Sequence, residues 1–102
     1  MRDHGKLLGL VGLGARGRLV VIGVDQVREA ARKGKVLLAL VAPDASEHGR
    51  KKVVPLLIAR RIPIVEGPSA AALGAAVGRE TTTVVGVVDR ALADGIRKLA
   101  DQ

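Results

Sequence analysis

The chain alternates between short apolar runs and longer segments whose apolar side chains follow helical spacing. Apolar or β-branched runs at 18–23, 36–42, 62–65 and 81–89 indicate buried strands. Apolar residues three or four positions apart predict helices over 4–15, 24–34, 44–61 and 68–78, and a last helix that begins at Asp89 and carries Leu92, Ile96 and Leu99. This order predicts an α/β fold, a three-layer α/β/α sandwich around a four-stranded, mostly parallel or mixed sheet.

Residues that favour helix ends stand close to these boundaries. Ser69 and Asp89 are predicted N-caps, and Gly78 is a predicted helix end. Asp44–Glu47 (DASE) resembles a capping box and is predicted to open the third helix. Pro55 lies inside that helix and is predicted to kink it.

The composition indicates a small folded domain. We expect the 102 residues to form one domain, 1–102, because 48% are hydrophobic and no low-complexity tract occurs. Aromatic residues are absent, so Val, Leu, Ile and Ala must fill the core. There is no cysteine, no signal-peptide pattern and no apolar run of membrane-spanning length, which together favour a cytoplasmic protein without a membrane partner.

The stretch GLGARG, from Gly12 to Gly17, has the G-x-G-x-x-G spacing of dinucleotide-binding loops. That loop needs a helix directly after its last glycine and an acidic residue about 20 positions on. Here a strand-like run follows Gly17, and Arg32 stands 20 positions after Gly12. We therefore predict no nucleotide cofactor, and we expect the glycines to end the first helix and lead into the first strand.

Other catalytic or metal-binding patterns are weak. His4 and His48 lack partners at metal-ligand spacing, and Ser46 and Ser69 stand at helix-cap positions outside any G-x-S-x-G motif. No acid/base pair is apparent. The sequence therefore predicts no catalytic residue, no metal and no cofactor, which argues against an enzyme.

The charge balance points to a polyanionic partner. Seventeen Lys and Arg against ten Asp and Glu give a formal net charge of +7. A basic domain of this size favours RNA or DNA as ligand, with a merely solubilising surface as the alternative. Missing aromatics count against binding by base stacking.

Two stretches together, IGVDQVREAARKGKVLLALVAPDAS and IPIVEGPSAAALGAAVGRE, resemble the ribosomal L7Ae/L30e superfamily, which includes the Gadd proteins. The chain looks most similar to the small bacterial YlxQ-like branch, over roughly Leu7 to Leu99. Many members of this family bind the RNA kink-turn or related internal loops. The resemblance implies contacts from the start of the second helix and from the loops after the second and third strands, where helix N-termini favour anions.

The resemblance assigns RNA-binding roles to individual positions. The matching residues are Gly23, Asp25 and Gln26 at the second helix and Pro68 and Ser69 after the third strand, and Arg28 in the same helix is a further candidate contact. Two positions that favour phosphate or a base edge in the family carry carboxylates here, Asp25 and Glu29. With Asp44, Glu47 and Glu66, they are expected to crowd the RNA-facing edge, where a carboxylate near a phosphate costs on the order of 1 kcal/mol.

Basic residues are predicted to gather at the opposite edge of the sheet. They precede the first three predicted strands: Arg16, Arg18, Lys33, Lys35, Arg60 and Arg61. Some complement helix dipoles, but Arg18 and Lys35 stand beyond the predicted helix ends and are candidate contacts to RNA phosphates.

The sequence therefore predicts a non-enzymatic RNA-binding protein associated with the ribosome or with translation. Its expected ligand is ribosomal RNA or a structured messenger RNA, possible partners are the ribosome or translation factors, and the free protein is expected to be a monomer. The alternative is a protein–protein adaptor of the same fold, which the carboxylates at the RNA-facing edge favour.

Overall fold

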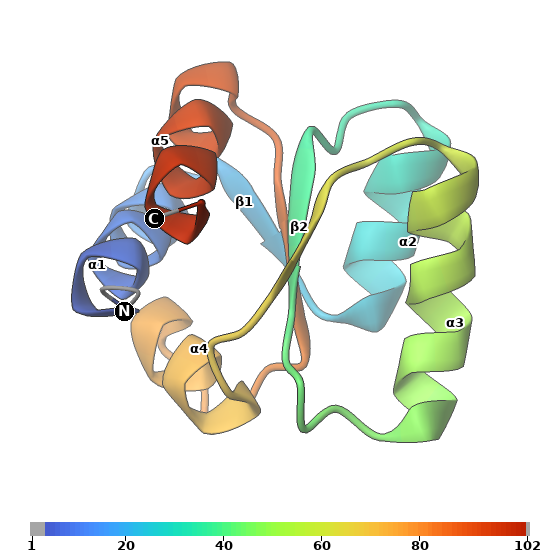
Figure 1. Cartoon of the computed structure of the whole chain (residues 1–102), viewed down its shortest axis with the longest axis horizontal. Coiled ribbons are helices and arrows are strands. Elements are labelled where there is room, and N and C mark those ends of the chain that lie inside the picture. The colour runs from blue at the N-terminus through green and yellow to red at the C-terminus, as the bar shows by residue number, and fades with distance from the viewer. Residues whose placement is uncertain (1–3, 102) are drawn as a thin grey trace.

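The computed structural model of the protein describes residues 4–101. Within this range each predicted segment forms the element expected of it (Figure 1). The elements are α1 (His4–Arg16), β1 (Val20–Ile22), α2 (Val24–Arg32), β2 (Leu38–Val41), α3 (Glu47–Ala59), β3 (Ile64–Glu66), α4 (Ala70–Val77), β4 (Val84–Val87) and α5 (Arg90–Ala100).

The strands form one mixed sheet in the order β1-β4-β2-β3. β2 and β3 are parallel, whereas β4 is antiparallel to both β1 and β2. The direction of β4 follows from the preceding turn, where the N–H of Thr82 donates to the carbonyl of Ala70 at 3.0 Å. This bond returns the chain to the start of α4, so β4 enters the sheet at the edge where β3 leaves it.

Helices cover both faces of the sheet. α2 and α3 pack on one face, and α1, α4 and α5 pack on the other (Figure 1). The buried strand β2 sends Leu38 and Leu40 to the α1/α4/α5 side and Ala39 and Val41 to the other, as strand alternation requires. None of the helices within 4–101 has both the length and the apolar character needed to cross a bilayer.

The helix caps follow the sequence in part. Ser69 Oγ accepts from the N–H of Ala72 at 3.2 Å, and Asp89 Oδ2 accepts from that of Leu92 at 2.9 Å. Gly78 ends α4 in the left-handed conformation, with φ 79°. These three predictions are confirmed.

The predicted capping box at Asp44–Glu47 is wrong. The N-cap of α3 is Ser46, whose Oγ accepts from the N–H of Gly49 at 3.1 Å. Asp44 instead binds the start of α4, a contact that its local sequence does not reveal. α3 continues past Pro55 to Ala59, and the Arg28 guanidinium donates to the carbonyl of Lys52, close to the turn where Pro55 supplies no backbone N–H.

The glycines of the GLGARG stretch do not act together as the turn that the sequence suggested. Gly12 and Gly14 are buried inside α1. A Cβ on Gly12 would lie 3.2 Å from the carbonyl oxygen of Ala76, and one on Gly14 would collide with the side chain of Leu92. The two glycines therefore allow α1 to lie close to α4 and α5. Only Gly17 stands in the turn after the helix.

Candidate nucleic-acid interface

Three helices begin along one edge of the sheet. β1, β2 and β3 run in the same direction, so their carboxyl ends meet there, and α2, α3 and α4 follow directly. We call this edge the helix-start rim and define it by the turns at 23–26, 42–47 and 66–70. It gathers three helix N-termini, whose first N–H groups point outward and favour anions.

Among these N-termini, the start of α2 is the one that no side chain caps. Gly23 has φ 95°, which favours glycine, and its N–H donates to the carbonyl of Val84 at 3.0 Å. Asp25 and Gln26 are exposed in the first turn, and within 4–101 the N–H groups of residues 24–26 have no acceptor. These groups are available to a ligand.

The start of α4 is partly closed by the protein itself. Ser69 accepts from Ala72, and Asp44 Oδ1 accepts from the N–H of Ala70 at 2.9 Å. Pro68 is buried beneath the turn, while Ser69 is exposed. The Ser69 hydroxyl accepts within the helix, so its O–H remains a donor that faces outward.

Replacing Asp44 by alanine is expected to lower the free energy of unfolding by about 0.5–2 kcal/mol, the usual cost of losing a carboxylate cap at a helix start. The change leaves the N–H of Ala70 without its acceptor. Urea denaturation measures the effect. Asp44→Asn, which keeps an acceptor oxygen, should lose much less, and an equal loss in both variants would contradict this role.

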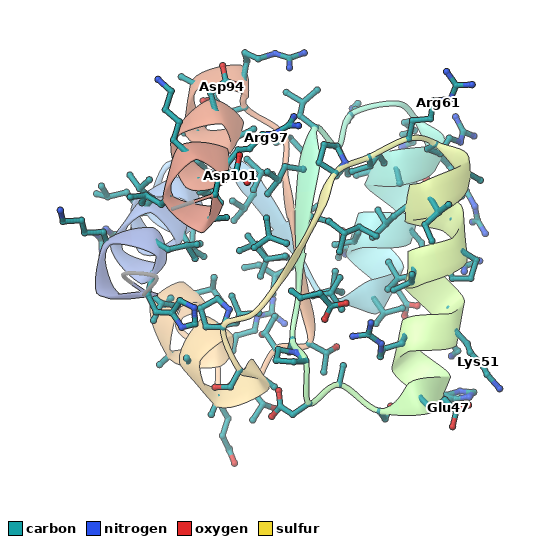
Figure 2. All side chains as sticks on the ribbon, viewed as in Figure 1. Glu47, Lys51, Arg61, Asp94, Arg97 and Asp101 are labelled. Carbon is teal, nitrogen blue, oxygen red and sulfur yellow. The ribbon has the colours of Figure 1, made fainter. Side chains whose placement is uncertain are left out.

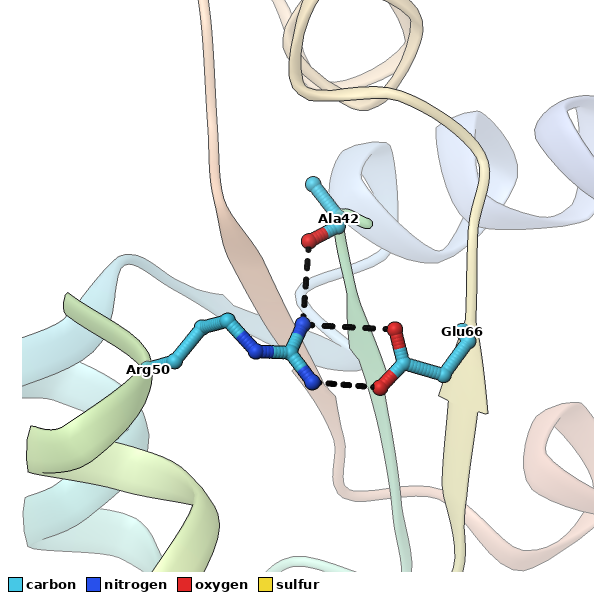
Figure 3. A network of polar contacts seen from close by, with 3 residues as sticks. All are labelled: Ala42, Arg50 and Glu66. Atoms are coloured by element: carbon cyan, nitrogen blue, oxygen red, sulfur yellow. Dashed lines mark hydrogen bonds and ion pairs between the residues drawn. The ribbon is translucent and has the colours of Figure 1, made fainter. Parts of the chain in front are cut away.

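An arginine on α3 joins the ends of two strands at this rim (Figure 3). The Arg50 guanidinium donates to both carboxylate oxygens of Glu66, at 2.6 and 3.2 Å, and to the carbonyl of Ala42 at 3.4 Å. The pKa of Arg50 is raised above its usual value, first by the hydrogen bonds to Glu66 and second by the negative charge of Glu66. The pair fixes the turn after β2 against the end of β3.

The carboxylates expected to crowd this rim are largely paired. Glu66 binds Arg50, and Glu47 lies 3.4 Å from the Lys51 ammonium. Glu29 lies past the middle of α2 and pairs with Lys33 at 3.2 Å, at the helix end away from the rim. Exposed pairs of this kind contribute little to stability. They do offset negative charge beside the helix N-termini.

The sequence and fold have clear relatives. The model of the ribosomal protein L7Ae/L30e/S12e/Gadd45 family matches residues 6–94. The chain belongs to this family. A Bacillus halodurans protein of unknown function is 33% identical, with 95% of this chain and 98% of that chain covered and a TM-score of 0.89. The Giardia lamblia 15.5kD RNA binding protein is 25% identical, with 93% and 82% covered and a TM-score of 0.76. A search of curated proteins gave no match.

In this L7Ae-family chain, most of the residues singled out from the sequence lie along one edge of the sheet. Gly23, Asp25 and Gln26 form the start of α2, and Pro68 and Ser69 form the turn before α4. All belong to the helix-start rim, because β1 and β3 end at the same edge.

Three other candidate residues lie elsewhere. Arg28 is half-buried and its guanidinium donates to the Lys52 carbonyl, so it joins α2 to α3. Arg18 and Lys35 are exposed in the turns before β1 and β2, at the opposite edge of the sheet. Apart from Arg28, the candidates therefore divide between two edges of the sheet.

The sequence interpretation missed the roles of Arg50 and Asp44. Arg50 is 16 positions from Glu66, and Asp44 is 26 positions from Ala70. No local motif marks either contact, because each depends on how β2, β3 and the two following helices are placed.

A hollow beside the rim brings the first and last helices together. It is lined by His4 and Leu7 of α1, by β3 and Gly67, and by Ala100 and Asp101 at the end of α5. Between residues 4 and 101, no three His, Asp or Glu side chains gather in a way that could hold a metal ion.

Proposed function

We propose that this protein of the L7Ae/L30e/S12e/Gadd45 family is a non-catalytic RNA-binding protein of the YlxQ-like branch, with residues 1–102 acting as one RNA-binding domain. The observation that carries the proposal is the open start of α2, at the same edge of the sheet as the Pro68–Ser69 turn. Similarity to the Giardia lamblia 15.5kD RNA binding protein supports it.

The helix-start rim offers groups suited to structured RNA. The free N–H groups of residues 24–26 bind phosphate, while the Gln26 amide and the Ser69 hydroxyl donate to base edges or phosphates. Because the chain has no aromatic residue, recognition relies on RNA shape, backbone contacts and extruded bases. A kink-turn-like element or a similar internal loop of ribosomal RNA provides these features.

The charges near the rim tune this binding. Asp25 is exposed in the first turn of α2. Its carboxylate interacts favourably with the helix dipole there, but it repels a phosphate. Glu66 and Glu47 repel less, because Arg50 and Lys51 pair with them. The rim therefore suits an RNA read by hydrogen bonds as well as by charge.

The family relationship supports the setting that we propose. The protein acts as a monomer when free, in the cytoplasm, and binds ribosomal RNA or a structured messenger RNA as part of the ribosome or beside translation factors.

Gln26→Glu is expected to weaken binding of a short kink-turn hairpin RNA by about tenfold or more, because it places a second carboxylate beside the open N–H groups. Fluorescence anisotropy at 0.1 M salt measures the affinity. Lys35→Gln is the matched control: it changes the net charge equally at an exposed position in the turn before β2, at the opposite edge of the sheet, and should weaken binding far less. Wild-type affinity should also fall steeply as salt rises.

No binding of the hairpin at low salt, or equal losses in the two variants, would contradict the proposal. Capture from lysate with and without nuclease tests the adaptor alternative. A protein partner that stays bound after nuclease treatment would favour the adaptor.

A further inference from the structure

Six exposed cations stand at the ends of α1, α2 and α3 and in the turns that lead from them into β1, β2 and β3, at the edge opposite the helix-start rim. We define this set as the basic pole: Arg16, Arg18, Lys33, Lys35, Arg60 and Arg61. Figure 2 shows Arg61 at one end of α3, with Glu47 and Lys51 at the other. Since β1 and β3 are three strand spacings apart in the sheet, these turns spread over about 14 Å.

Two of these arginines hold a backbone conformation that favours glycine. α1 and α3 end with the same pair of backbone hydrogen bonds. At the end of α1, the N–H of Leu19 donates to the carbonyl of Gly14 at 2.8 Å, and that of Arg18 to the carbonyl of Ala15 at 3.3 Å. At the end of α3, the N–H of Ile62 donates to the carbonyl of Leu57 at 2.9 Å, and that of Arg61 to the carbonyl of Ile58 at 3.0 Å. α2 ends in the same way, with Gly34 at φ 72° in the matching place.

Arg18 has φ 60° and Arg61 has φ 56°, and they are the two non-glycine residues with positive φ among those described. This conformation is unfavourable for a residue with a Cβ, and glycine is the usual choice at such a helix end. The turn itself gains nothing from arginine. The backbone conformation therefore does not explain the arginines at these two positions.

Helix dipoles and internal ion pairs do not account for this charge. Arg18, Lys35 and Arg61 stand beyond the last residues of their helices, where the dipole effect fades. Within residues 4–101, Lys33 pairs with Glu29, whereas Arg18 and Lys35 have no carboxylate at ion-pairing distance. The pole keeps its positive charge for a ligand.

We propose that the basic pole is a second RNA-binding surface, which holds the phosphate backbone of an RNA double helix while the helix-start rim holds a kink-turn-like element. The proposal rests on the proposed function of the rim. A double helix suits the pole because its phosphates are accessible without base stacking, and this chain has no aromatic side chain for stacking. The protein then bridges two arms of one folded RNA.

The test uses two probes, a 16-base-pair RNA duplex without internal loops and the short kink-turn hairpin. Arg18→Gln combined with Lys35→Gln should weaken duplex binding about tenfold or more at 0.1 M salt. It should also lower the slope of log affinity against log salt by about 1.4–1.8, since each lost phosphate contact removes about 0.7–0.9. Hairpin affinity should change little.

The matched control is Lys52→Gln combined with Lys98→Gln, which removes the same charge from exposed positions on α3 and α5. Equal effects of the two double variants on the duplex would overturn the proposal. Gln26→Glu should weaken the hairpin and spare the duplex, so failure of the rim and failure of the pole are distinguishable. Displacement of the duplex by polyglutamate as readily as by RNA would assign the pole to an acidic protein instead.

A second pair of substitutions separates ligand binding from architecture. Arg18→Gly combined with Arg61→Gly should raise Tm by about 4 °C or more, because glycine relieves the left-handed conformation. The same variant should bind the duplex about tenfold more weakly. A more stable protein with unchanged duplex affinity would show that the arginines have no role in RNA binding.

Discussion

Replacing Leu40 by alanine is expected to lower the free energy of unfolding by about 2–5 kcal/mol, the largest effect of any single substitution considered. Leu40 lies on β2, is completely buried and packs in the α1/α4/α5 cluster. Without aromatic residues, the aliphatic side chains around it are too small to fill the space that it would leave. A domain with about 5–15 kcal/mol of total stability would lose much of it.

Urea denaturation followed by far-ultraviolet circular dichroism measures this loss. Leu13→Ala is the control, because Leu13 is 57% exposed on α1 and its truncation leaves no cavity. Its free energy of unfolding should change by about 0.5 kcal/mol or less. A loss below about 1 kcal/mol for Leu40→Ala would show that the core collapses around the cavity, and would contradict the packing described.

The second large effect is expected at Gly74 in α4. A Cβ there would lie 2.6 Å from Cα of Thr81 and 2.8 Å from the carbonyl oxygen of Glu80, both backbone atoms that cannot move without shifting the turn. Gly74→Ala should therefore cost about 1–3 kcal/mol, although alanine favours helices. The displaced turn also carries the Thr82–Ala70 hydrogen bond that directs β4.

Gly9→Ala is the matched control for this prediction. Gly9 is also inside a helix, but a Cβ there would meet nothing within 4 Å. Alanine should therefore raise the free energy of unfolding by about 0.5–1 kcal/mol through helix propensity alone. The same sign of change in both variants would show that Gly74 is not needed for close packing.

The sequence predicted those parts of the fold that depend on neighbouring residues. The caps at Ser69 and Asp89 and the helix end at Gly78 involve partners within a few positions, so their residue types are informative. The helix-start rim could also be predicted from the sequence, because strands that run in one direction must end at one edge. The family resemblance then indicated which of its residues are candidate RNA contacts.

Long-range contacts could not be predicted in this way. The antiparallel direction of β4 depends on the turn after α4, and the Asp44 carboxylate binds a helix that begins 26 positions later. Gly12 and Gly14 resembled turn residues, but they are needed for close helix contacts that no local pattern reveals. The Arg50–Glu66 pair has the same origin, since it joins two segments that only the sheet brings together.

The hollow that His4 and Asp101 share with Gly67 has a practical consequence. A purification tag or fluorophore joined ahead of α1 or behind α5 would start its path beside the Pro68–Ser69 turn, where it would compete with a bulky ligand for room. An immobilised protein should therefore be anchored through an engineered cysteine on the exposed side of α3, for example at Lys52, which is exposed near the middle of the helix and away from both edges of the sheet. Because the natural chain contains no cysteine, that attachment would be unique.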